Sequence, residues 1–215
     1  MASRDYSRIQ IEASSEPLCM TKKPARITRM RRRLFAGGIV ALAIGAAALS
    51  KGCAVKYDNR NPISERFPSV VGQSLEKEEV RLPEDFAGEP VVLLVGYLQR
   101  TQFDIDRWIL GLIQADVRAK ILEVPTIPGL ATSLASGWID DGMRSGIPEE
   151  DWAVVITLYG ASAKPVAKFT GNRGGQNARV LVLDANGEVA WFTDRGYSAT
   201  QALDVKRVTD VLMGE

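Results

Sequence analysis

The pattern of hydrophobic and polar residues predicts a sheet with its central strand over Val91–Tyr97. This run is rich in valine and leucine and apolar on both faces, which is typical of a strand in the middle of a sheet. Similar runs predict four more strands, over Lys120–Val124, Ala153–Tyr159, Arg179–Leu183 and Glu188–Phe192. The turn between the last two ends in Asn-Gly, a strong β-hairpin signal. Upstream, residues 70–83 predict two short strands around a charged turn.

Helical periodicity follows the central strand and returns at the C-terminus. From Gln102 to Arg118, apolar residues at spacings of three and four predict a buried face of Ile105, Trp108, Ile109, Leu112, Ile113 and Val117. Thr101 is expected to cap this helix, with Asp104 completing a capping box. Ser198 is expected to cap the last helix, with Gln201 as its box partner and with a buried stripe of Val205, Val208 and Leu212. Residues 126–146 are interpreted as an insertion, helical from about Pro128 to Met143.

The N-terminal quarter has a different pattern. Residues 1–29 are polar without periodicity and are expected to be a disordered extension. Three arginines, at 31–33, then precede an uncharged apolar run at 34–49, so residues 30–53 are predicted to be a signal peptide or membrane anchor. Residues 54–69 are polar, contain two prolines and are predicted to be a linker to a domain over 70–215.

Several forms of this N-terminal signal remain open. The apolar run holds 16 residues, short of the roughly 20 that cross a bilayer, so an uncleaved anchor and a cleaved signal are both possible. A third form is a lipoprotein signal, in which Cys53, preceded by Gly52, would carry the lipid. Translation could begin at Met1, Met20 or Met30. In each form the arginines stay in the cytoplasm, and the domain is expected on the periplasmic side of a bacterial inner membrane.

Composition narrows the function further. The chain has no histidine, and its two cysteines, Cys19 and Cys53, both precede the predicted domain, which therefore has no thiol nucleophile, internal disulfide or cysteine-ligated metal. Residues 1–52 hold ten of the 27 basic and three of the 26 acidic residues. The remaining 17 basic and 23 acidic residues give residues 53–215 a net charge of −6, so nucleic-acid binding is not expected.

Two segments resemble the thioredoxin-like superfamily. Gly72, Leu75, Val80, Leu82, Pro83, Phe86, Gly88, Pro90 and residues 91–94 resemble the start of peroxiredoxin-type domains, and the hairpin from Leu181 to Val189 resembles the last two strands of the family. The resemblance implies an α/β fold with a thioredoxin-like central sheet flanked by helices. It also implies a cysteine before the first helix and a cis-proline before the last hairpin, where this chain has Arg100-Thr101 and Asn177-Ala178. The C-terminal part, through Val189-Ala190-Trp191 and Gly196, resembles a family of mitochondrial ATP-synthase assembly factors.

These observations favour a non-catalytic, membrane-tethered protein of the cell envelope: an assembly factor or scaffold, without a cofactor, that binds another envelope protein. The candidate interaction residues are Arg100, Trp138, Trp152, Trp191 and Arg195. One alternative is a metal- or carboxylate-dependent enzyme that would use Asp104, Asp106, Asp140 and Asp141. Another is a small-ligand carrier, in which Arg100 and the helix N-terminus would bind an anion at the turn without cysteines. The glycine-rich stretch 171–177 is interpreted as a surface loop.

Overall fold

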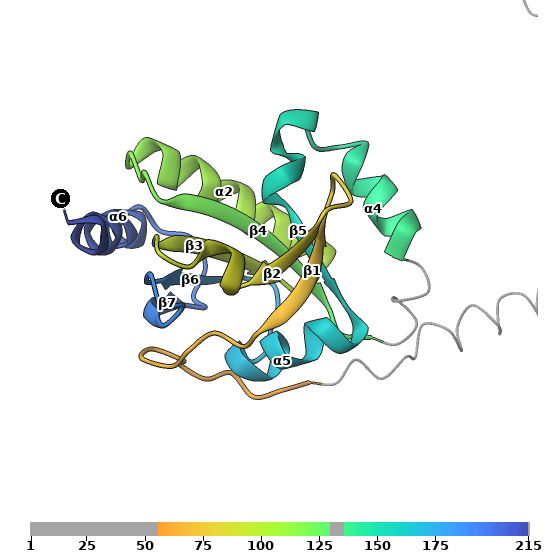
Figure 1. The fold of residues 1–215 in the computed structure, drawn as a ribbon, viewed down its shortest axis with the longest axis horizontal. Coiled ribbons are helices and arrows are strands. Elements are labelled where there is room, and N and C mark those ends of the chain that lie inside the picture. The colour runs from red at the N-terminus through yellow and green to blue at the C-terminus, as the bar shows by residue number, and fades with distance from the viewer. Residues whose placement is uncertain (1–55, 130–135, 215) are drawn as a thin grey trace, which may run out of the picture. The chain divides into compact units, whose positions relative to one another are not determined.

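The computed structural model describes residues 56–129 and 136–214, whose seven strands form one mixed sheet with helices on both faces (Figure 1). The strands are β1 Val70–Ser74, β2 Glu79–Leu82, β3 Val91–Gly96, β4 Lys120–Ile127, β5 Ile156–Tyr159, β6 Arg179–Leu183 and β7 Val189–Thr193. The helices are α2 Gln102–Gln114, α4 Ser136–Arg144, α5 Gly160–Thr170 and α6 Ala199–Met213. The predicted α/β class is confirmed, and the expected hairpin over 70–83 joins the central sheet as β1 and β2.

The strand order is β2-β1-β5-β4-β3-β6-β7, with β3 parallel to β4 and antiparallel to β6. The unit β3-α2-β4 is followed, after β5 and α5, by the hairpin β6-β7 and helix α6. A central sheet flanked by helices is the arrangement that the resemblance to the thioredoxin-like superfamily implies. The strand order brings the end of β3, the start of α2 and the loop before β6 to the same end of the sheet.

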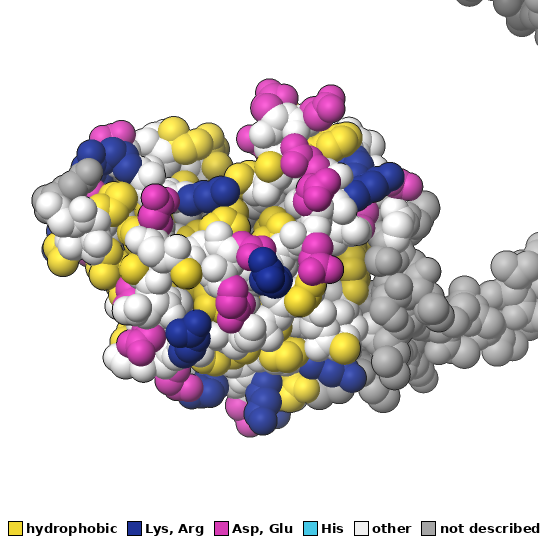
Figure 2. Space-filling view, in the orientation of Figure 1, with side chains coloured by type: hydrophobic (Ala, Val, Ile, Leu, Met, Phe, Trp, Pro, Cys, Tyr) yellow, Lys and Arg dark blue, Asp and Glu magenta, His cyan; other side chains and the backbone are white. Residues whose placement is uncertain are grey.

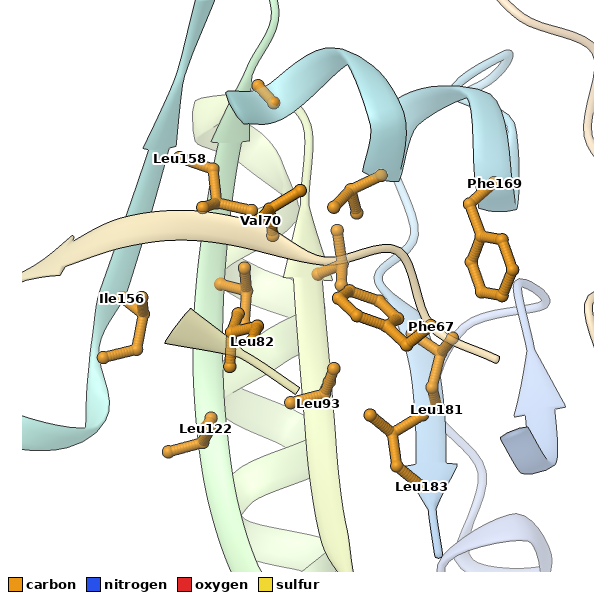
Figure 3. Packing of buried hydrophobic residues seen from close by; sticks show 14 of the residues in the cluster. Phe67, Val70, Leu82, Leu93, Leu122, Ile156, Leu158, Phe169, Leu181 and Leu183 are labelled. Carbon is orange, nitrogen blue, oxygen red and sulfur yellow. The ribbon is translucent and has the colours of Figure 1, made fainter. Parts of the chain in front are cut away.

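Strand β3 is buried on both faces, as its apolar run predicts. Val91, Leu93 and Val95 belong to the core beneath α5, part of which Figure 3 shows around Leu93, Leu122 and Leu181. Val92 and Leu94 belong to the second core, beneath α2 and α6. On the face that Figure 2 shows, cationic and anionic side chains are interspersed with hydrophobic ones.

Several boundaries differ from those predicted. Strand β5 begins at Ile156 and not at Ala153, because residues 149–154 form a 3-10 helix. Strand β4 continues through Pro125 to Ile127, where it pairs with β5. Helix α5 was not predicted: Pro165 lies inside it, and proline ordinarily argues against a helix interior.

The two outer helices bury fewer residues than predicted. Ile113 of α2 is 64% exposed and Leu212 of α6 is 37% exposed, although both were expected in buried stripes. Helix α2 rests on the sheet through Ile105, Trp108 and Leu112, and Ile113 is turned about 100° from Leu112.

The domain begins earlier than predicted. Tyr57 and Phe67 pack against the core beneath α5, and Phe67 is 1% exposed, so much of the expected linker at 54–69 lies on the domain surface. Backbone hydrogen bonds join Ser64 and Glu65 to Val189 of β7. Among the helices that the structure describes, none has the length and apolar character needed to cross a membrane. The predicted anchor at 34–49 and Cys53 lie outside the described residues.

Candidate functional site: the turn before helix α2 and a groove beside strand β7

The turn Leu98–Thr101 stands where the resemblance implies a reactive cysteine. Its last three residues form a short 3-10 helix that leads into α2. The buried Thr101 hydroxyl donates to the carbonyl of Gly175 (2.6 Å) and accepts from the amide of Leu98 (3.2 Å). The predicted capping box of Thr101 with Asp104 is therefore wrong, because the hydroxyl joins the turn to the loop before β6. The turn at which the resemblance implies a reactive cysteine therefore holds Thr101, whose hydroxyl makes structural hydrogen bonds.

Asp104 is buried and has structural partners of its own. One carboxylate oxygen accepts from the amide of Ala178 (3.0 Å). The other accepts from the amide of Tyr197 and from the guanidinium of Arg107, at 3.0 and 3.1 Å. The carboxylate thus ties α2 to the start of β6 and to the loop before α6. A proline at position 178 could not donate the first of these bonds, because proline lacks an amide hydrogen.

Arg179 is a buried cation that sequence reasoning placed only as the first residue of a strand. It is 1% exposed, and its guanidinium donates to the carbonyls of Asn177 (2.9 Å) and Arg173 (2.8 Å) and to the side chain of Asn59 (3.1 Å). It lies 5.7 Å from the ring centre of Tyr97. Burial lowers the pKa of this guanidinium. The one available signal was an arginine at the start of an otherwise apolar strand.

The other candidate carboxylates also have local partners. Asp106 accepts from Gln102 (2.9 Å), Asp140 accepts from the hydroxyl of Tyr159 (2.7 Å), and Asp141 pairs with Arg144 (2.8 Å). Within residues 56–129 and 136–214, no three metal-ligating side chains gather into a group that could hold an ion.

Glu123 of β4 is a buried carboxyl group that the sequence analysis did not single out. It is 7% exposed, and the side-chain amide of Gln102, 3.4 Å away, is shared with Asp106. Burial raises the pKa of Glu123 to about 6, with a smaller opposing effect from the Gln102 hydrogen bond and a further increase from the nearby Asp106 carboxylate. Neither pocket-lining set that the structure gives includes Glu123, so the described residues do not place it in a cleft.

A groove with a volume of about 420 Å³ lies beside β7 and includes two of the candidate interaction residues, Trp191 and Arg195. Its wall also contains Asn59, Arg60, Asn61, Phe192, Thr193, Asp194, Gln201 and Asp204. Trp191 is half-buried and meets Trp108 edge to face at 6.2 Å, whereas Arg195 is exposed. The groove therefore combines an aromatic wall with charged groups of both signs.

The remaining candidates lie elsewhere. Arg100 is exposed at the turn and does not line the groove. Trp152 donates its ring N–H to the carbonyl of Ile147 (3.0 Å) and lies beside the guanidinium of Arg144. The side chain of Trp138 lies outside what the structure describes.

Strand β7 is an edge strand, and the groove follows its outer side. The segment Ser64–Glu65 covers this edge only at Val189. From Ala190 to Thr193, the outer edge has no backbone partner among the described residues. An exposed strand edge of this kind can pair with an added extended segment.

Comparisons with solved structures show that this chain is similar to known proteins in its fold. No family model matches the sequence, and no curated protein matches it either. Copper-bound yeast Sco1 shares 11% identity over 73% of this chain and 96% of its own, with a TM-score of 0.49. A secreted thiol-disulfide isomerase from Corynebacterium glutamicum shares 17% identity over 74% and 94%, with a TM-score of 0.45. An exposed lipoprotein thioredoxin from Streptococcus pneumoniae shares 13% over 65% and 98%, with a TM-score of 0.46. Because the identities are low and these TM-scores are below 0.5, nothing about activity is carried over to this chain.

Proposed function

We propose that this protein is a non-catalytic, membrane-tethered binding protein of the bacterial cell envelope, an assembly factor or scaffold that holds another envelope protein on the periplasmic side. The observation that carries this proposal is the contrast between two places on the fold. The turn before α2 is closed by the structural bonds of Thr101, whereas the groove beside β7 is open and lined by Trp191 and Arg195.

The chemistry of the groove suits an extended polypeptide segment. From Ala190 to Thr193 the edge of β7 has no backbone partner among the described residues and offers backbone donors and acceptors, and such edges give affinity through main-chain hydrogen bonds. Trp191 offers an aromatic surface, and tryptophan and arginine are frequent binding hot spots. The groove is lined by charged groups of both signs, which favours a partner with charges of both signs; these groups are Arg60, Asp194, Arg195 and Asp204.

The tether is supported by the arginine cluster at 31–33 and the apolar run at 34–49. A protein held at the membrane meets its partners at raised effective concentration, so a modest groove can suffice.

The test is affinity capture of the tagged full-length chain from solubilised membranes, with mass spectrometry of the recovered proteins. One partner recovered in constant ratio is expected, and Arg195→Glu should lower its recovery at least fivefold because it reverses a charge in the groove. Lys77→Glu makes the same charge reversal at an exposed position in the turn between β1 and β2, at the opposite edge of the sheet, and serves as the matched control, with recovery unchanged. Equal loss in both variants would contradict the assignment to the groove. Absence of any partner, with a metal or small molecule on the purified protein, would overturn the scaffold proposal.

A further inference from the structure

The first described residues are held at one end of the domain. Tyr57 makes two hydrogen bonds with Asn172. The side chain of Asn172 accepts from the backbone amide of Tyr57 (2.8 Å), and the backbone amide of Asn172 donates to the carbonyl of Tyr57 (3.2 Å). Next to it, Asp58 pairs with Arg173 (2.7 Å). The chain therefore joins the domain at the loop Gly171–Asn177.

The same loop reaches the turn before α2. The carbonyl of Gly175 accepts from the Thr101 hydroxyl, and a Cβ atom placed on Gly175 would lie 3.6 Å from Leu98. The tether and the turn thus lie at one end of the molecule. In Figure 1 the described chain begins, in orange, below α5, and the C-terminal end of α6 lies far to its left.

The chain available for a tether is short. Seven residues, 50–56, separate the apolar run from Tyr57 and span at most about 25 Å when fully extended. If Cys53 carries a lipid, three residues remain, with a reach of about 10 Å. Either length keeps the end of the domain that bears the loop and the turn close to the lipid headgroups.

The end of the domain that bears the loop and the turn carries apolar side chains that are exposed among the described residues. Leu98 is 45% exposed and Phe103, in the first turn of α2, is 74% exposed. Between them lies the exposed Arg100. Leucine and phenylalanine beside a basic residue form the composition of a surface that enters the headgroup region of a bilayer.

We propose that Leu98 and Phe103 rest in the headgroup layer of the membrane to which the chain is tethered, with Arg100 facing lipid phosphates. This inference rests on the tether in the proposed function. Two weak anchors together hold a domain more firmly than one, so the contact fixes the orientation of the domain on the membrane and keeps the groove at a constant height above it.

The experiment places an environment-sensitive fluorescent amino acid at position 103 of the full-length chain by codon suppression, which leaves both cysteines intact. The matched control is position 211, because Val211 is 75% exposed but lies near the C-terminal end of α6. In vesicles of phosphatidylethanolamine and phosphatidylglycerol, headgroup-attached nitroxide is expected to quench the probe at 103 at least threefold more than the probe at 211. A probe at position 98 should follow position 103.

Three results would overturn the proposal, each in a different way. Equal quenching at 103 and 211 in vesicle-bound protein would reject the contact and leave the tether intact. Failure of the chain to remain with the vesicles would reject the tether itself. Shielding of position 103 in native membranes but not in pure lipid would assign the patch to a protein partner.

Discussion

At the scale of single residues, the buried polar groups hold loops together around the start of α2. Thr101, Asp104 and Arg179 each join segments that are far apart in the sequence. Removing one partner from such a bond leaves a desolvated group that costs about 1–3 kcal/mol. These bonds hold the turn before α2 against the loops before β6 and α6.

Sequence reasoning placed Thr101 and Asp104 at the start of a helix but assigned them the wrong partners. Their real partners, Gly175, Ala178 and Tyr197, are 74 to 93 residues further along the chain. Local patterns such as a capping box describe only neighbours along one helix. The contacts of a buried hydroxyl or carboxylate depend on which loops the fold brings together. Local patterns along the chain do not reveal which loops those are.

The raised pKa of Glu123 predicts how the stability of the protein depends on pH. Its pKa is raised by burial from 4.5 in an exposed chain to about 6 in the folded protein, so the folded state binds the proton more tightly. The folded state therefore loses stability as pH rises from 4.5 through 6, by about 2 kcal/mol in total. Glu123→Gln, which cannot ionise, should be more stable than the wild type at pH 7 by about that amount.

Urea unfolding of both proteins at pH 4 and pH 7 measures this difference. At pH 4 the two free energies of unfolding should agree within about 0.5 kcal/mol, because Glu123 is then protonated in both states. Glu79→Gln makes the same substitution at an exposed position of β2 and is the control. A wild type that is as stable as Glu123→Gln at both pH values would show that Glu123 titrates like an exposed group.

At the scale of elements, α2 approaches the loop before α6 closely at Gly111. A Cβ atom on Gly111 would lie 2.3 Å from the ring of Tyr197, which itself packs edge to face on Trp108 at 5.6 Å. Gly111→Ala should therefore destabilise the protein by about 1–2 kcal/mol, even though alanine favours a helix by about 1 kcal/mol.

Gly142→Ala in α4 is the matched change, because nothing lies within 4 Å of the added methyl group. It should leave the free energy of unfolding unchanged or raise it by up to about 1 kcal/mol. Opposite signs in the two variants, measured by urea unfolding, would identify the Tyr197 contact as the cause. Stabilisation by Gly111→Ala would show that the ring moves aside freely.

The elements that were predicted correctly are those with a strong local signal. Strands β3 and β6 are continuous apolar runs, and the hairpin turn at Asn186-Gly187 places Gly187 at a φ of 78°, which favours glycine. Helix α5 was missed because Pro165 weakens the helical pattern, although its apolar face packs on the sheet through Ala163 and Val166. Here tertiary burial outweighs local propensity.

At the scale of the whole molecule, the folded unit includes the segment that sequence composition assigned to a linker. Phe67 lies in the core and meets Phe169 edge to face at 5.6 Å. A protein that begins at Val70 should therefore be less stable than one that begins at Lys56 by about 3–5 kcal/mol, the usual cost of losing a buried phenylalanine.

Chemical unfolding of residues 56–215 and 70–215 measures this difference, and Phe67→Ala in the longer chain separates the loss of the side chain from the loss of the segment. Equal stability of the two lengths would show that the segment only lies on the surface. The groove gives a second reason to keep it, because Asn59, Arg60 and Asn61 form part of the groove wall.

The two hydrogen bonds between Tyr57 and Asn172 also have a mechanical consequence. A pull on the chain upstream of Tyr57 would first load the two hydrogen bonds between Tyr57 and Asn172 and the Asp58–Arg173 pair. The hydrogen bond from the buried Arg179 to the side chain of Asn59 would carry the load next. Because the Tyr57 side chain also packs against the core beneath α5, such a pull would be resisted by apolar packing as well as by these polar contacts.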